Sequence, residues 1–176
     1  MTSGLLVVDV QNAVVVGMPG RDELVTTIAR LVDDARAAGS PVIWVQHEVE
    51  DLPHGTWGWE IVPELRQAAG EPVIEKHHRS AFGDTGLGDL LRGRGIERVI
   101  VVGAQSAFCV DMAGKHALAE GFDVTWVSDG HGNGDQETSD GVVQDAKVRA
   151  LLNRTWSSMR HPGRTVEVVS SDDVRW

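Results

Sequence analysis

The sequence is poor in cysteine, in basic side chains and in long apolar runs, and each shortage excludes a class of protein. Its 176 residues include one cysteine, Cys109, which excludes an internal disulfide and fits a reducing compartment. Sixteen Lys and Arg stand against 26 Asp and Glu, and the resulting formal net charge of -10 argues against nucleic acid or an anionic membrane as partner. No apolar run approaches the ~20 residues that a membrane helix requires. We therefore expect a cytoplasmic protein.

What is present describes one globular domain. Hydrophobic residues make up 41% of the chain and charged residues 24%, which is enough apolar material for a sizeable core. The first residues, MTSGLLVVDVQ, contain no basic segment and meet Asp9 after a short apolar run, so we interpret them as a first strand and not as a signal peptide. No repeat, low-complexity segment or long linker divides the chain, so residues 1–176 are predicted to form a single domain.

Apolar runs alternate with helical patterns along the chain. Near-continuous apolar runs predict strands over residues 4–8, 41–45, 72–75, 99–102, 122–127 and 165–169. Helical periodicity predicts helices over residues 21–38, 60–69, 106–121 and 136–159, and a small helical face from Leu87 to Leu91. The last long helix is expected to bury an apolar stripe of Val142, Val143, Ala146, Leu151 and Leu152. This alternation indicates a three-layer α/β/α fold whose six-stranded parallel sheet is doubly wound.

Cys109 lies where a strand passes through a small-residue turn into a helix, in the segment ERVIVVGAQSAFCVDMAGKHALA. Ser106 is predicted to cap this helix, which makes Cys109 its third residue. Free amide groups and the helix dipole at that position favour a thiolate, and hence a nucleophile. A lone cysteine is more often buried and inert. The segment alone leaves both interpretations open.

Two other residues are expected at the same edge of the sheet as Cys109. Asp9 ends the first predicted strand and Lys76 follows the third. In a doubly wound sheet, ligands bind beyond the carboxyl ends of the strands. An ammonium there stabilises both a thiolate and a carboxylate, and the carboxylate can act as base to the thiol and later as acid to a leaving amine. Their joint placement favours a catalytic cysteine.

Three segments carry a family resemblance: VVDVQN at 7–12, VIEKHHRSAF at 73–82, and GAQSAFCVDMAGKHALAEGFDVTWVSDG at 103–130. In this order and spacing, the sequence resembles the isochorismatase-like cysteine hydrolases over nearly its whole length. The resemblance implies a six-stranded parallel sheet flanked by helices and a catalytic triad of Asp9, Lys76 and Cys109. It also implies a cis peptide between Ala104 and Gln105, with the amides of Gln105 and Cys109 facing a developing oxyanion.

We expect no metal and no cofactor. The nicotinamidase branch of the family binds a metal through an Asp-x-His pair and a further His after the second strand. Here that segment offers His47, Asp51 and His54 in a different spacing, and solvated polar side chains explain them better. The glycines at 130, 132 and 134 lack the third spaced glycine and the following acid of a dinucleotide loop.

The remaining candidates concern substrate binding. Gln11 either bonds the substrate or holds the loop after the first strand. Phe82 and Phe108 are predicted to line the pocket. Trp57 and Trp59 form either an aromatic wall over the site or packing at the surface or at a subunit contact.

Together these features predict a hydrolase that cleaves a C–N bond of a small amide or carbamoyl compound through a thioester. Isochorismatase-type hydrolysis of a vinyl ether is the first alternative, because it needs Asp9 as an acid but no thiol. A catalytically silent binding protein and a redox thiol are two others, and the redox thiol is weakened because the chain has no resolving cysteine. The resemblance also implies a homo-oligomer, either a dimer or a tetramer.

Overall fold

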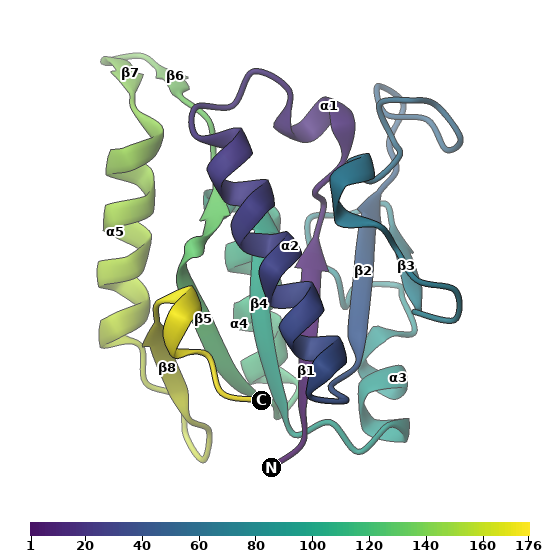
Figure 1. Cartoon of the computed structure of the whole chain (residues 1–176). Helices are drawn as coiled ribbons and strands as arrows, with labels where there is room; N and C mark the ends of the chain where they lie inside the picture. Colours follow the sequence, from purple (N-terminus) through teal and green to yellow (C-terminus); the bar gives the residue numbers. More distant parts are fainter.

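The computed structural model describes all 176 residues and contains a six-stranded sheet between two layers of helices (Figure 1). The strand order is β3-β2-β1-β4-β5-β8, and every neighbouring pair is parallel. The strands are β1 (Ser3–Val8), β2 (Val42–His47), β3 (Val73–Lys76), β4 (Arg98–Ala104), β5 (Asp123–Gly132) and β8 (Val166–Val169). The chain begins in the middle of the sheet, winds outward to β3 and then returns to β4 on the other side of β1. The predicted α/β/α fold is confirmed.

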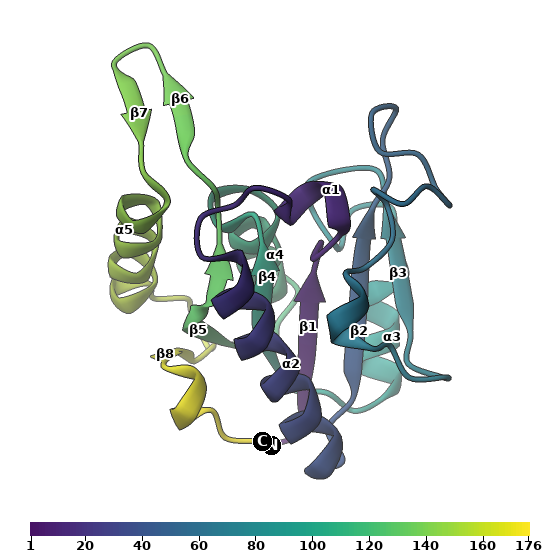
Figure 2. The same cartoon turned by 45° about the horizontal axis from the view of Figure 1, so that its top comes forward.

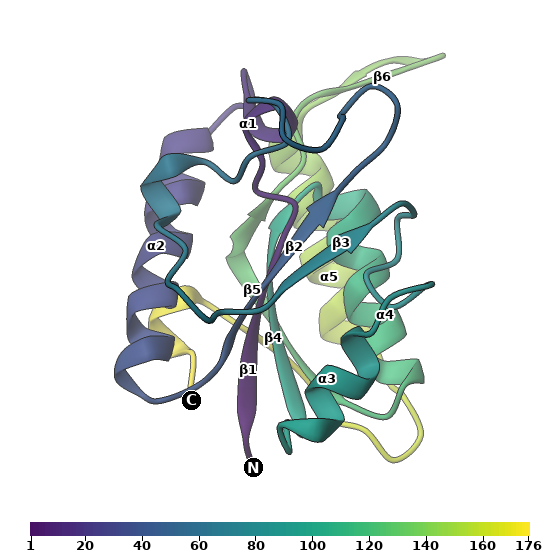
Figure 3. The same ribbon diagram turned by 90° about the vertical axis from the view of Figure 1, so that its right-hand side faces the viewer.

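Helices cover both faces of the sheet because side chains alternate along its central strands. The longer helices are α2 (Arg21–Ala37), α3 (Leu87–Gly93), α4 (Asp111–Ala119) and α5 (Asp145–Ser158). In β1, Leu5 and Val7 pack with α2, whereas Leu6 and Val8 pack with the side chains of α3 and α4. Figure 3 shows α2 as the one long helix on one face and the other three on the opposite face. No helix combines the length and the apolar character that crossing a membrane demands.

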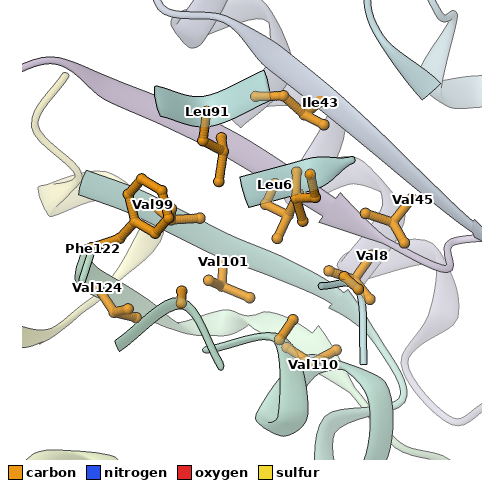
Figure 4. Close-up of a cluster of buried hydrophobic side chains, with 14 of the residues drawn as sticks. Leu6, Val8, Ile43, Val45, Leu91, Val99, Val101, Val110, Phe122 and Val124 are labelled. Atoms are coloured by element: carbon orange, nitrogen blue, oxygen red, sulfur yellow. The ribbon is translucent and has the colours of Figure 1, made fainter. Parts of the chain in front are cut away.

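The core on the α3 and α4 face consists mainly of β-branched and aliphatic side chains from the four central strands (Figure 4). Trp126 of β5 stacks on Trp156 of α5, with ring centroids 4.7 Å apart and planes at 9°. Both rings are fully buried. Offset stacking of this kind adds to the free energy gained by burial alone, so α5 is held to the sheet chiefly through Trp156.

The predicted helix over residues 136–159 is wrong in its first third. Residues 136–143 form an antiparallel hairpin of β6 (Gln136–Thr138) and β7 (Gly141–Val143), which projects beyond the sheet in Figure 2. Gly141 has a φ of 112°, a conformation that ends any helical pattern there. The predicted stripe is wrong as well, because Val142 is 60% exposed and Leu151 is 67% exposed.

Shorter segments also differ from their predicted bounds. The helix expected over residues 60–69 is a single 3-10 turn, because Arg66 takes a φ of 41° and stops it. β2, β4 and β5 run past their predicted ends, to His47, Ala104 and Gly132. The remaining short elements are α1 (Asn12–Val15), η1 (Pro63–Leu65), η2 (Ser106–Val110) and η3 (Ser171–Asp173). The extension of β2 matters most, because it carries His47 to the edge of the sheet where Asp9 and Lys76 lie.

Candidate active site

The structure brings Asp9, Lys76 and Cys109 together at the carboxyl edge of the sheet. Asp9 directly follows β1, Lys76 is the last residue of β3, and Cys109 lies in the turn after β4. The Nζ atom of Lys76 lies 2.8 Å from Oδ2 of Asp9 and 3.4 Å from Sγ of Cys109. The three residues are 1%, 0% and 8% exposed, so their charges interact in a site that holds little water.

His47 is a fourth member of this cluster, although the sequence predicted a solvated side chain at this position. Its Nδ1 atom lies 2.8 Å from Nζ of Lys76, 3.7 Å from Oδ2 of Asp9 and 3.8 Å from Sγ of Cys109. The strand-end rule that located Asp9 and Lys76 also applies to β2, whose last residue is His47. The predicted strand stopped at Val45, because Gln46 and His47 are polar. For this reason the sequence did not place His47 at the end of a strand.

Gln11 holds His47 in place. Its side-chain Nε2 donates to the carbonyl oxygens of His47 and Trp59 at 3.0 and 2.7 Å, and its Oε1 accepts the His47 amide at 2.8 Å. The Gln11 side chain is fully buried and bonded to backbone at both ends. Gln11 therefore has a structural role, and the backbone that it holds is the end of β2 and the segment that follows. Substrate binding by Gln11 is not supported.

The side chains of Asp9, His47 and Cys109 have the spacing of a metal cluster, because their ligand atoms all lie within 4.8 Å of one another. The ammonium of Lys76 lies 2.8 to 3.4 Å from an atom of each of them. A buried cation of the protein itself thus faces all three ligands and would repel a metal ion. This arrangement does not fit a metal site.

Asp51 and His54 are the other two possible metal ligands of the segment after β2. Both lie apart from this cluster. Asp51 is exposed, and His54 packs on the ring of Trp59 with centroids 4.1 Å apart. The Nε2 atom of His54 lies 3.2 Å from a carboxylate oxygen of Glu75. These contacts are those of a surface loop.

The strand β4 meets the cysteine turn through a close backbone approach. A Cβ at Gly103 would lie 2.0 Å from the carbonyl oxygen of Val8, so only glycine fits there. The bond between Ala104 and Gln105 is cis, as the family resemblance implies. Residues Ser106–Val110 then form one π-helical turn that continues into α4.

The predicted cap of this turn is wrong. The helical turn begins at Ser106 itself, so Cys109 is its fourth residue and not its third. The Ser106 hydroxyl is paired with Nδ1 of the buried His131 at 2.7 Å. Asn133 takes the capping role, because its Oδ1 accepts the Ala107 amide at 2.8 Å. The cap therefore comes from the segment after β5, which is distant in sequence.

The expectation of a resting thiolate is also wrong. Burial, and then the charge of Asp9, raise the pKa of Cys109 to about 12, while Lys76 opposes this rise. Cys109 is thus a neutral thiol at neutral pH, next to a carboxylate that can take its proton. The nucleophile has to be generated during the reaction and is not stored in the resting site.

A cavity of about 460 Å³ opens above the cluster. Its walls combine the site residues with apolar side chains: Asp9, Ala13, Val14, His47, Val49, Leu52, Arg79, Ala104, Gln105, Phe108, Cys109 and Gln136. Among the predicted substrate-binding residues, Phe108 lines this cavity. Arg79 and Gln136 also line it and were not singled out from the sequence, because each lies in an irregular or hairpin segment whose path the pattern does not give.

Trp57, Trp59 and Phe82 do not line the cavity. Trp57 is 65% exposed, Trp59 packs on His54, and Phe82 packs near Phe122 with ring centroids 6.2 Å apart. For the two tryptophans, surface packing is the better of the predicted alternatives. The prediction that Phe82 lines the pocket is not supported.

This site can be compared with those of known proteins. Residues 3–155 match the Isochorismatase domain family, which covers all the strands of the sheet except β8. The chain belongs to the isochorismatase-like hydrolase family. The match includes Asp9, His47, Lys76 and Cys109, and so the whole cluster.

Members of this family include hydrolases and amidases. The chain is 37% identical over 174 residues to streptothricin hydrolase of Streptomyces noursei, covering 94% of this chain and 67% of that protein. It spans only 47% to 59% of the length of several other curated relatives.

Solved structures of isochorismatase-like proteins share the fold. An isochorismatase from Pseudomonas putida KT2440 superimposes with a TM-score of 0.88 at 28% identity, over 98% of this chain and 90% of that one. N-carbamoylsarcosine amidase from Thermoplasma acidophilum gives a TM-score of 0.78 at 26% identity, over 100% of both chains.

Proposed function

We propose that this protein hydrolyses a C–N bond of a small amide or carbamoyl compound, with Cys109 as the nucleophile. The observation that carries the proposal is the buried contact of Lys76 with both Asp9 and Cys109, at the floor of a cavity of substrate size. The neutral thiol next to a carboxylate is the starting state that general-base activation requires. The hydrolase and amidase relatives support this reaction class.

In the first half of the reaction, Asp9 takes the proton of the Cys109 thiol as Sγ attacks the carbonyl carbon. A C–S bond forms, and the electron pair of the C=O π bond moves to the oxygen. Gln105 lines the cavity and its backbone amide donates to no acceptor of the protein, so this amide is free to stabilise the oxyanion. The Cys109 amide is the second donor of this proposal.

The tetrahedral intermediate then collapses. The oxygen re-forms the C=O bond, the C–N bond breaks, and Asp9 returns its proton to the leaving nitrogen, which departs as ammonia or an amine. Water, giving a proton to Asp9, attacks the resulting thioester. The C–S bond breaks, the acid product leaves, and the proton returns to Sγ. Atoms and charge balance, and no cofactor is required.

Lys76 serves this sequence by compensating the negative charge that alternates between Asp9 and the sulfur. Its ammonium contacts both groups, so the charge can pass from one to the other without losing its counter-ion. Because Lys76 is fully buried behind them, we assign it no contact with the substrate.

The test is a screen of primary amides, N-carbamoyl compounds, lactams and isochorismate, with Cys109→Ala as the control enzyme. Denaturing the wild-type protein during turnover and measuring its mass should show the acyl group of the substrate added to Cys109. Full turnover by Cys109→Ala on the same substrate would overturn the covalent mechanism. Turnover of isochorismate alone, with no adduct, would instead favour vinyl ether hydrolysis.

A further inference from the structure

We propose that Arg79 determines the specificity of this site and selects substrates that carry a carboxylate next to the scissile amide. This inference rests on the proposed function and adds a substrate class to it. It follows from the position of Arg79, from its lack of a partner, and from the character of the other cavity walls.

Arg79 is an exposed residue that lines the cavity, and its guanidinium lies next to the residue that precedes the nucleophile. Arg79 follows Lys76 by three residues, and its Cζ atom stands 4.6 Å from the ring centroid of Phe108. Phe108 immediately precedes Cys109, and all three residues line the same cavity. A substrate that reaches the thiol therefore passes within the field of this cation.

Arg79 has no carboxylate partner in a protein with ten more acidic than basic side chains. Six of the thirteen arginines pair with a carboxylate, as Arg36 does with Glu71 and Arg149 with Asp145, each at 2.8 Å, and Arg79 is the unpaired arginine that lines this cavity. The contact with the Phe108 ring is a cation–π contact, which takes up none of the guanidinium N–H groups as a hydrogen-bond donor to an oxygen or nitrogen. Those N–H groups form a fork that matches a carboxylate.

The rest of the cavity wall has no other unpaired cation that could bind an anion. Asp9 is already compensated by Lys76, and the outer wall is apolar, with Ala13, Val14, Val49 and Leu52 among its side chains. Since the net charge of -10 repels anions at long range, attraction of a carboxylate has to be local. The substrate that fits has a reactive carbonyl at Cys109, a small apolar body and a carboxylate at Arg79.

A first test uses the reactivity of Cys109 and requires no hydrolysis. Two pairs of thiol reagents differ mainly in a carboxylate: iodoacetate against iodoacetamide, and 3-maleimidopropionate against N-ethylmaleimide. For each pair, the ratio of the two rate constants is measured for the protein and divided by the same ratio for glutathione. The ratio cancels any change in the amount of thiolate, so it reports on the selection of the anion.

In Arg79→Gln the ratio should fall by about threefold to tenfold for at least one pair, whereas Arg79→Lys should keep part of it. Arg154→Gln is the matched control, since it makes the same change in net charge at an exposed position of α5, away from the cavity. A ratio that is the same in wild type, Arg79→Gln and Arg154→Gln for both pairs would overturn the proposal.

A second test compares N-carbamoylalanine with its methyl ester as substrates. Arg79→Gln should lower kcat/KM by about tenfold to a hundredfold on the acid, chiefly through KM, and leave the ester nearly unchanged. Equal losses on acid and ester would mean that Arg79 only orients Phe108, and would overturn the proposal. If the wild type cleaves no amide at all, the proposed function fails, and the alkylation ratios still decide the role of Arg79.

Discussion

The Nδ1 atom of His47 lies 2.8 Å from Nζ of Lys76. The same ammonium also contacts Oδ2 of Asp9 at 2.8 Å, the carbonyl oxygen of His78 at 3.1 Å and Sγ of Cys109 at 3.4 Å. An ammonium has three N–H groups for these four neighbours, so none is left for a substrate. When it donates to Nδ1, the imidazole is neutral and its proton is on Nε2. His47 thus fixes the direction in which Lys76 faces Asp9 and Cys109.

Two substitutions of His47 should therefore show whether this residue positions Lys76 or only fills space beside it. His47→Ala removes one of the four neighbours that fix the direction of the Lys76 ammonium, so its N–H groups can turn away from Asp9 and Cys109, and kcat should fall about tenfold to a hundredfold. His47→Asn keeps an acceptor near the position of Nδ1 and should recover most of that loss. The measurement is kcat and KM for both variants, with urea unfolding as a check on the fold. Equal kcat losses in the two variants would contradict the positioning role.

The thiol of Cys109 should titrate far above the ordinary range. Since burial and the charge of Asp9 raise its pKa to about 12, the rate of alkylation by iodoacetamide should keep rising beyond pH ~10. An ordinary cysteine levels off near ~8.5. The rate is measured across this range on the wild-type protein, with Cys109→Ala as the blank. A plateau near the ordinary value would contradict this description of the site.

Substitution of Asp9 should change reactivity and turnover in opposite directions. The charge of Asp9 raises the pKa of Cys109, so Asp9→Asn should produce more thiolate and faster alkylation at neutral pH. The same change removes the general base and should abolish hydrolysis of the amide. Lys76→Met should slow alkylation, because Lys76 lowers the pKa of the thiol. Slower alkylation in Asp9→Asn would show that its charge does not govern the thiol.

The buried His131 should make the protein less stable in acid. Burial lowers its pKa from 6.5 to about 4, so the unfolded chain takes up a proton that the folded chain does not. Stability from this group is complete above pH 6.5 and is lost as the pH falls towards 4, by about 2 kcal/mol between pH 6.5 and pH 5. Urea unfolding at several pH values measures this loss.

His131→Gln provides the control for that measurement. It removes the titrating ring while keeping groups able to bond to Ser106 and Asn153, which lie 2.7 and 2.9 Å from the two ring nitrogens. Its stability at neutral pH should fall, but the decline between pH 6.5 and pH 5 should be smaller than in the wild type by about 2 kcal/mol. An unchanged decline would assign the acid sensitivity to other groups.

Much of the architecture could be predicted because the apolar runs are local and strong. A strand buried on both faces has to be apolar throughout, and β1 and β4 show this directly in the sequence. Parallel strands place their carboxyl ends at one edge, so Asp9, Lys76 and Cys109 could be expected to meet without knowledge of any side-chain contact. The hairpin at residues 136–143 could not be predicted in this way, because its strands are only three residues long and largely exposed, and Val142 and Val143 also fit a helical stripe.

The sequence by itself thus determined which polar residues stand at the carboxyl ends of the strands, because this depends only on where the apolar runs stop. What only the tertiary structure decided is how those ends are surrounded. The neutral state of Cys109 results from burial among groups distant in sequence, against the local effect of a helix start. The cluster contact of His47 and the cavity position of Arg79 likewise depend on side-chain directions, which packing fixes and periodicity does not.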